Sequence, residues 1–169
     1  MAKQYGVQAI RTILNCLSGG QFDSAVRTAL LEASCMAGIA AMNCSVGVAH
    51  AFAHACATCG VGHGQANGWA LIQAIRFNQD TPQMGQLLSS LGVNSCATLI
   101  AQLDPLLEPL RQSFEAAKFR RELSLENTVD NLAELMMDDV AARTNPVPLR
   151  KQACVAFIRN ISADLGARV

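Results

Sequence analysis

The three histidines of this chain, His50, His54 and His63, lie close together in the sequence. His50 and His54 have the spacing i, i+4, so on a helix their imidazoles lie one turn apart on the same face. A glycine-containing turn, residues 60–62, follows and can return His63 toward that helix. Imidazole is a common metal ligand and exchanges protons near neutral pH. The segment therefore predicts a metal site or a proton-transfer site.

Each histidine also has a simpler interpretation. His50 and His63 could be hydrogen-bonded core residues, because a catalytic metal site normally has three protein ligands and these two supply fewer. His54 could be an ordinary surface residue of a helix, because an acid or base needs a substrate within hydrogen-bond reach. These alternatives stay open on the residues alone.

Cys56 and Cys59 form a Cys-x-x-Cys pair that is followed by His63. Such a pair could contribute to a zinc site together with His50 or His54. It could also be a redox pair in which one thiol has a lowered pKa. We favour a third interpretation, in which both are small buried residues of an alanine-rich helix, since free cysteine often behaves as a small apolar residue.

The composition excludes several classes of protein. Hydrophobic residues make up 51% of the chain and charged residues 15%, which excludes a disordered chain. The 13 basic and 13 acidic residues form no basic block, so no nucleic-acid partner is expected. The longest uninterrupted apolar runs, 38–42 and 46–49, are far shorter than the ~20 residues that span a bilayer, so no membrane partner is expected.

The cysteine content predicts the cellular location of the chain, and the excess of apolar residues predicts its partner. Seven cysteines is an odd number, which indicates free thiols in a reducing cytoplasm, and no signal peptide is recognised. The apolar excess predicts a covered surface and therefore a homo-oligomer.

Apolar residues recur at the helical spacing i, i+3, i+4, i+7, and no strand-like alternation persists. The pattern predicts an all-α, multi-helix bundle of about eight helices that forms a single domain over residues 1–169. The second helix should begin at residue 22 or 23, and its small, apolar part at 29–41 should be buried on several sides.

Turn and cap residues predict where the other helices begin. Ser45 is the expected cap of the helix that carries His50 and His54, and Thr81 and Ser95 are expected caps of later helices. Pro105 should open a new helix over 106–119. The Asn145-Pro146 dipeptide marks a loop, and Asp138-Asp139 is interpreted as a solvated pair at a helix end.

Two motifs and their flanks point to a known family. The motifs are Gly-Val-Ala-His-Ala-Phe-Ala-His at 47–54 and Gly-His-Gly-Gln-Ala-Asn at 62–67. The flanks are the small-residue helix at 30–40, Arg-Phe-Asn at 76–78 and Thr-Asn-Pro-Val-Pro-Leu at 144–149. In this order they resemble the C-terminal helical half of the iron-containing (group III) alcohol dehydrogenases, a dehydroquinate-synthase-like domain.

The resemblance implies a role for each histidine. His50 and His63 match metal-ligand histidines, and His54 matches a histidine that lies near the nicotinamide and transfers a proton. The family has a Rossmann-like N-terminal domain for NAD(P), a divalent ion that is usually iron and sometimes zinc, and alcohol or aldehyde oxidoreductase activity.

The chain also departs from the family pattern. The cofactor domain is not part of it, and the Asp-x-x-x-His pair that supplies the other two ligands is missing, since Asp23 is followed four residues later by Arg27. The interval between His54 and His63 is one residue short, and 55–59 differs from the usual sequence.

Two hypotheses follow from the resemblance and these departures. In the first, the chain is an oxidoreductase half that works only with a separate cofactor-binding partner chain, which completes an otherwise incomplete iron or zinc site. In the second, it is a catalytically inactive helical remnant that acts as a self-associating or metal-binding interaction module.

Overall fold

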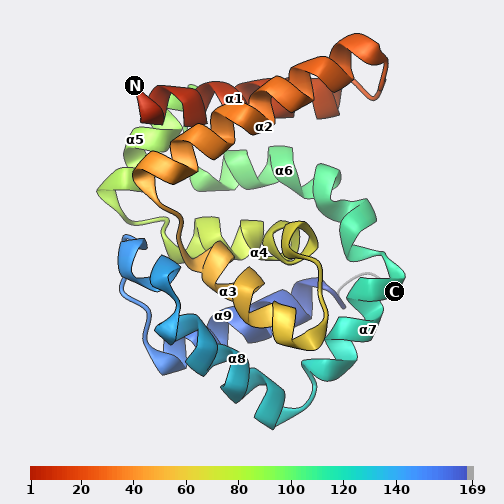
Figure 1. Cartoon of the computed structure of the whole chain (residues 1–169), viewed down its shortest axis with the longest axis vertical. Helices are drawn as coiled ribbons and strands as arrows, with labels where there is room; N and C mark the ends of the chain where they lie inside the picture. The colour runs from red at the N-terminus through yellow and green to blue at the C-terminus, as the bar shows by residue number, and fades with distance from the viewer. Residues whose placement is uncertain (167–169) are drawn as a thin grey trace. The chain divides into compact units, whose positions relative to one another are not determined.

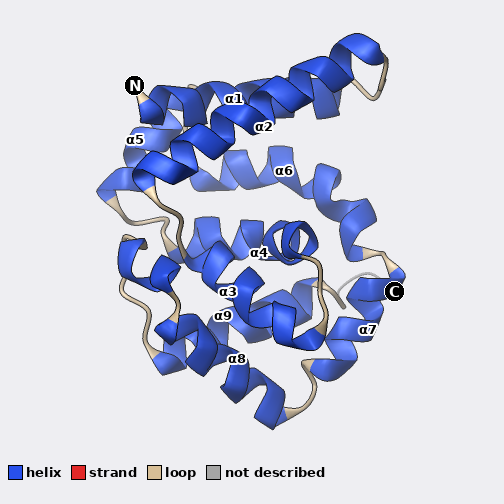
Figure 2. Cartoon of the chain, viewed as in Figure 1, coloured by secondary structure: helices blue, strands red, loops and turns tan. Residues whose placement is uncertain are grey.

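The computed structural model describes residues 1–166, and every regular element in that range is helical (Figure 2). This confirms the predicted all-α fold. The described residues divide into two compact units, which are Met1–Ser45 with Gly85–Leu106, and Val46–Met84 with the described residues from Leu107 on. The expectation of a single domain over residues 1–169 stays a prediction.

The first unit is built on a pair of helices, α1 (Ala2–Ser18) and α2 (Ser24–Cys44), which lie along one another (Figure 1). Asp23 caps α2, because its Oδ1 accepts a hydrogen bond of 2.8 Å from the Val26 N–H. The predicted start of this helix is therefore confirmed. Parts of α5 (Pro82–Leu91) and α6 (Cys96–Arg111) complete the unit, and the Arg11 guanidinium donates to the Ser90 carbonyl.

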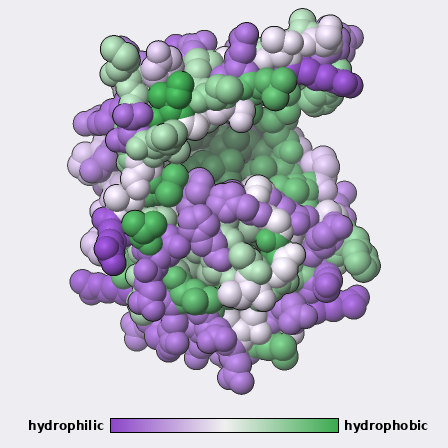
Figure 3. Space-filling model, viewed as in Figure 1, coloured by the Kyte–Doolittle hydropathy of each residue, from purple (hydrophilic) through white to green (hydrophobic). Residues whose placement is uncertain are grey.

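The predicted burial of 29–41 is wrong. Among the residues of α2 only Ala33 is buried, whereas Leu31 is 70% exposed and Met42 is 90% exposed. The physical reason is that α2 packs along α1 on one side, which leaves apolar side chains uncovered elsewhere around the helix (Figure 3).

The apolar character of α2 extends over a longer stretch than the short uninterrupted apolar runs of the sequence indicate. The helix has 21 residues, and an 18-residue stretch of it has a mean hydropathy of 1.3, because Arg27 and Glu32 are its two charged residues. By length and composition alone it is long and apolar enough to cross a membrane, a test that the core helix of a soluble protein and a signal sequence near the N-terminus also pass.

The second unit has the larger core, and α3 (Val48–Cys56) lies at its centre. This helix packs against α4 (His63–Phe77) and α8 (Glu126–Asp138), while α9 (Lys151–Asp164) packs on α4 and α8. The Phe52 ring is fully buried and makes edge contacts with Phe119 of α7 (Phe114–Glu122) and with Phe157. Burial on this scale fixes the position of α3.

The predicted caps of two later helices are confirmed. The Thr81 hydroxyl accepts a hydrogen bond of 3.2 Å from the Met84 N–H at the start of α5. The Ser95 hydroxyl accepts one of 3.1 Å from the Thr98 N–H at the start of α6. Side-chain oxygens at these positions satisfy N–H groups that have no partner within the helix.

The predicted helix boundary at Pro105 is wrong. α6 continues through both Pro105 and Pro109 to Arg111, and the break comes at 112–113, where the Ser113 hydroxyl caps α7. A proline inside a helix removes one hydrogen bond and can bend the helix without ending it. The last turn of α6 is also held from outside, because the Trp69 indole donates to the Leu110 carbonyl at 3.1 Å.

Candidate functional site

The three histidines come from two consecutive helices of the second unit. α3 carries His50 and His54, and the chain then turns through a short 3-10 helix (Ala57–Cys59) and Gly60, whose φ of +72° favours glycine. His63 is the first residue of α4. The predicted turn therefore returns the third imidazole to the helix that carries the other two.

The three imidazole rings form one cluster, which we call the histidine cluster. The ring centroids of His50 and His54 are 6.1 Å apart, those of His50 and His63 are 5.2 Å apart, and those of His54 and His63 are 5.1 Å apart. The rings of His54 and His63 are stacked, with an angle of 23° between their planes. The sequence spacing alone left the position of His63 open, and the fold brings it within reach of the other two.

An acidic residue that sequence reasoning missed joins the cluster. The Asp139 Oδ2 lies 2.8 Å from the Nδ1 of His54, and its Oδ1 accepts a hydrogen bond of 2.7 Å from the Ala141 N–H. The Asp139 side chain is only 16% exposed, so its interpretation as part of a solvated pair is wrong. The two residues are 85 positions apart, and no local pattern links them.

His63 has a neighbour on its own helix. The Asn67 Nδ2 lies 3.1 Å from the Nε2 of His63 and also donates to the His63 carbonyl at 3.1 Å. The i, i+4 spacing on α4 places the two side chains on one face. Asn67 belongs to the motif that carries the resemblance, but no role follows for it from the sequence.

The surroundings of His50 favour its neutral form. Burial lowers the pKa of the His50 imidazole below its ordinary value, and the neighbouring His63 and His54 lower the pKa further, while Asp139 acts in the opposite direction. Because a metal binds to the unprotonated nitrogen of imidazole, this shift leaves His50 in the form that binds metal.

His50 and His63 lie close enough together to be considered as two ligands of one ion. Histidine ligands bind a metal through nitrogen at about 2.0–2.1 Å, so their rings must be neighbours, and the ring centroids of these two are 5.2 Å apart. Among residues 1–166 no group of three or more His, Cys, Asp or Glu side chains is arranged to hold an ion.

Cys56 of the Cys-x-x-Cys pair does not have the environment of a reactive thiol. Cys56 is fully buried, and burial together with the neighbouring Cys59 raises the pKa of its thiol. A raised pKa disfavours the thiolate, which is the reactive and metal-binding form, so Cys56 is not the thiol of lowered pKa that the redox alternative requires. Its complete burial supports the interpretation as a small apolar residue.

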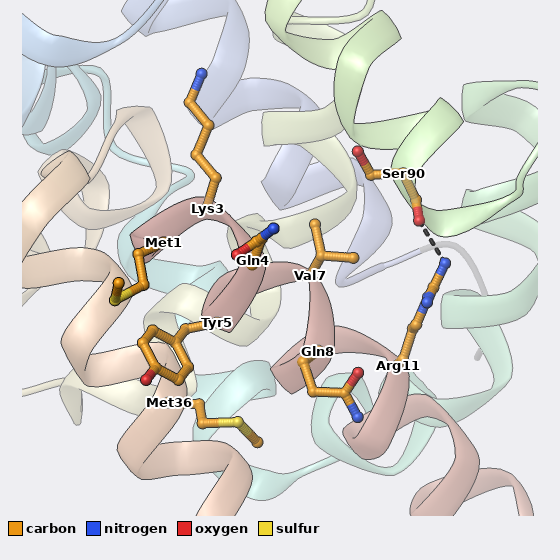
Figure 4. Close-up of a pocket in the computed structure, with 9 residues that line it drawn as sticks. All are labelled: Met1, Lys3, Gln4, Tyr5, Val7, Gln8, Arg11, Met36 and Ser90. Carbon is orange, nitrogen blue, oxygen red and sulfur yellow. Dashed lines mark hydrogen bonds between the residues drawn. The ribbon is translucent and has the colours of Figure 1, made fainter.

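A pocket in the first unit is lined by residues that do not belong to the histidine cluster. It has a volume of about 570 Å³ and lies in the first unit, lined mainly by α1 residues together with Met36 of α2 and Ser90 of α5 (Figure 4). Lys3, Arg11 and Tyr5 supply its titratable groups, and none of the histidines reaches it. The histidine cluster is therefore the stronger candidate.

The start of α3 is held by a side chain from the Thr144-Asn145-Pro146 loop. The helix begins after Gly47, which has no side chain to cap it, so the expected cap at Ser45 is wrong. The Asn145 Oδ1 accepts a hydrogen bond of 3.0 Å from the Val48 N–H, and the Thr144 hydroxyl donates to the Val46 carbonyl at 2.6 Å. A Cβ on Gly47 would lie 2.6 Å from the Asn145 Oδ1, so this close approach requires glycine.

Asn145 also binds the end of α4. Its Nδ2 donates to the Asn78 Oδ1 at 2.9 Å and to the Val147 carbonyl at 2.7 Å, and its Oδ1 accepts from the Asn78 Nδ2 at 3.2 Å. The Asn145 residue is only 8% exposed. We call these contacts the Asn145 clamp, and they join the first turn of α3 to the last turn of α4.

Replacing Asn145 with alanine should destabilise the second unit. The Asn145→Ala variant leaves the Val48 N–H and the Asn78 amide without these partners, and we expect a loss of about 1–3 kcal/mol in the free energy of unfolding. Urea denaturation measures it. The exposed Asn43, which bonds only a carbonyl of its own helix, is the control, and Asn43→Ala should change stability by about 0.5 kcal/mol or less. Equal losses in the two variants would contradict the clamp.

The free energy of unfolding should fall as the pH is lowered below about 6.5, the ordinary imidazole pKa. The folded-state pKa of His50 is lower than its unfolded value, so the unfolded chain binds more protons in the interval between the two. Urea denaturation of the wild type and of His50→Gln at about pH 8, 6.5 and 5 measures the effect. The wild type should lose more stability than the variant on acidification, and parallel pH profiles would show the prediction to be wrong.

Comparison with known proteins places this site in a family. The chain is 28% identical over 140 residues to the NADPH-dependent butanol dehydrogenase of Clostridium saccharobutylicum, a match that covers 76% of this chain and 36% of that protein. Its fold is similar to that of an iron-containing alcohol dehydrogenase from Thermococcus thioreducens, with a TM-score of 0.81 and 23% identity over 95% of this chain and 44% of the other. The chain therefore spans less than half the length of these relatives.

The family model supports the same assignment over nearly the whole chain. The model described as the Fe-containing alcohol dehydrogenase family, C-terminal, matches residues 2–162. The match includes every residue of the histidine cluster and of the Asn145 clamp. The chain belongs to the Fe-containing alcohol dehydrogenase family and carries that family's C-terminal domain.

Proposed function

We propose that this chain is the metal-binding helical half of a nicotinamide-dependent alcohol or aldehyde oxidoreductase. The observation that carries the proposal is the convergence of all three histidines in one cluster. A cofactor-binding half from outside these 169 residues would complete the enzyme, supplied by a separate partner chain. The family membership and the greater length of the relatives support the need for such a half.

In this proposal His50 and His63 hold a divalent ion, iron or zinc, since imidazole suits both. When bound, the ion would polarise the alcohol oxygen and the nicotinamide of NAD(P) would accept the hydride. His54 stacks on His63 and is the base that takes up the hydroxyl proton. The lowered pKa of His50 supports its part as a neutral ligand.

A cytoplasmic location belongs to the same proposal. The seven cysteines are all free thiols, which is typical of proteins in a reducing compartment.

A chimera tests the proposed function. In it, this chain replaces the part of the C. saccharobutylicum butanol dehydrogenase to which it is similar, and both bound metal and butanol-dependent reduction of NADP⁺ are measured. We expect the chimera to retain metal and activity, because His50 and His63 would join the ligands of the other half. The His50→Ala and His63→Ala chimeras should lose both while still binding NADPH.

The exposed residue Gln79 lies outside the cluster, so Gln79→Ala in the same chimera is the control and should change neither quantity. A chimera that binds NADPH but neither retains metal nor reduces NADP⁺ would rule out the enzyme proposal.

The second candidate function is that of a self-associating module, and an apolar stripe on α2 favours it. Leu31, Cys35, Ile39 and Met42 share one side of the helix, and all four are exposed. An exposed apolar stripe is typical of a surface that another protein covers, and we propose that a second copy of this chain covers it.

Sedimentation velocity tests this self-association. We expect the wild type to sediment as an oligomer at micromolar concentration, and the Leu31→Glu/Met42→Glu variant to sediment as a monomer because charge is costly to bury. Asn43 lies to one side of the stripe, so Asn43→Glu is the control and should leave the oligomer intact. A monomeric wild type would contradict the proposal.

A further inference from the structure

The carboxylate of Asp139 is held by a backbone N–H of the segment that follows it as well as by its contact with the histidine cluster. Its Oδ1 accepts from the Ala141 N–H at 2.7 Å and so caps the short 3-10 helix Val140–Thr144. The remaining oxygen, Oδ2, lies 2.8 Å from the Nδ1 of His54. The orientation of the carboxylate is therefore set by the chain that follows it and does not depend on His54.

This contact determines which ring nitrogen of His54 carries the proton. An ionised carboxylate can only accept hydrogen bonds, so the Nδ1 of His54 must be the donor. In a neutral imidazole with a proton on Nδ1, the Nε2 is unprotonated and can accept a proton. None of the described residues forms a hydrogen bond with this Nε2.

We propose that Asp139 is the positioning residue of His54: it holds the imidazole as the Nδ1–H tautomer and so presents Nε2 as the proton acceptor of the site. The catalytic part of this inference rests on the proposed oxidoreductase function, whereas the tautomer does not.

The proton transfer balances in this arrangement. In the proposed oxidation the O–H bond of the alcohol would break and an Nε2–H bond would form on His54, and the nicotinamide of the completing half would accept the hydride from the carbon. The Asp139 carboxylate keeps its contact with Nδ1 while Nε2 takes up the proton. The His54 side chain is 43% exposed, so water can reach the ring and carry the proton away.

The substitution Asp139→Asn makes a sharp test of the tautomer. To keep the cap, the Asn Oδ1 must accept from the Ala141 N–H, which turns its NH₂ group toward the Nδ1 of His54. The amide then donates to Nδ1, and the ring must carry its proton on Nε2. A single substitution that preserves the shape of the side chain should thus reverse the tautomer.

The measurement is the ¹H–¹⁵N correlation spectrum of the imidazoles in the metal-free full chain at about pH 8.5, where ordinary imidazole, with a pKa of about 6.5, is neutral. The chain has three histidines, so the spectrum of His54→Gln assigns the His54 signals. We expect the Nδ1–H pattern in the wild type and the Nε2–H pattern in Asp139→Asn.

Two further variants distinguish the effect of the Asp139–His54 contact from effects of folding and of net charge. Asp139→Ser can still cap the 3-10 helix but is too short to hold His54, so it should give a mixture of tautomers. Asp138→Asn makes the same change of charge at the neighbouring position and should keep the Nδ1–H pattern. A wild type without the Nδ1–H pattern, or an Asp139→Asn variant that retains it, would overturn the proposal.

The catalytic part is tested in the chimera described above. Asp139→Asn should lower kcat about tenfold or more while KM and metal content change little. In this variant Nε2 of His54 already carries a proton and cannot act as the base, whereas the proposed metal ligands His50 and His63 are unchanged. An unchanged kcat would overturn this part. If the wild-type chimera is inactive, the oxidoreductase proposal and this catalytic part fail together, and the tautomer measurement still decides the positioning of His54 by Asp139.

Discussion

The helix that carries two of the three histidines begins after a glycine, which has no side chain to cap it. The position of this helix therefore depends on a side chain from elsewhere in the chain that satisfies its first N–H group. Gly47 precedes α3 and leaves room for the Asn145 side chain, which accepts the hydrogen bond of the Val48 N–H. The same side chain holds Asn78 at the end of α4. One buried amide thus joins the helix of His50 and His54 to the helix of His63, and a buried polar group with this many partners tolerates little displacement.

The core of the second unit fixes α3 from the other side. Phe52 contacts one aromatic ring from α7 and one from α9, and Ala51, Ala53 and Ala55 of α3 are buried. Small residues allow helices to approach closely, and a close-packed interior resists rotation of the helix. The histidines therefore stay on the side of α3 that faces α4, where the rings of His50 and His54 can meet that of His63.

The cluster combines two different electrostatic environments within a few ångströms. Burial and two neighbouring imidazoles favour neutral His50, whereas His54 faces the carboxylate of Asp139. A neutral imidazole is suited to hold a metal, and an imidazole paired with a carboxylate is suited to move a proton. These environments correspond to the separate roles that the family resemblance implies for the two residues, and they support the proposal of a half-site that another half completes.

Local features of this protein could be predicted from the sequence because they depend on residues close together in the chain. The helical periodicity, the start of the second helix at residue 22 or 23, the caps at Thr81 and Ser95, and the turn before His63 are of this kind, and the structure contains all of them. The family motifs also identified the histidine segment as the candidate site.

Only the tertiary structure decided which distant residues support that segment. The contact of Asp139 with His54 and that of Asn145 with Val48 join residues 85 and 97 positions apart, and no local pattern encodes them. The path of α6 through Pro105 and the exposure of Leu31 on α2 were likewise mispredicted, because they depend on which surfaces pack together. Spacing determines which side chains share a helix face, whereas the packing of the whole chain determines what that face meets.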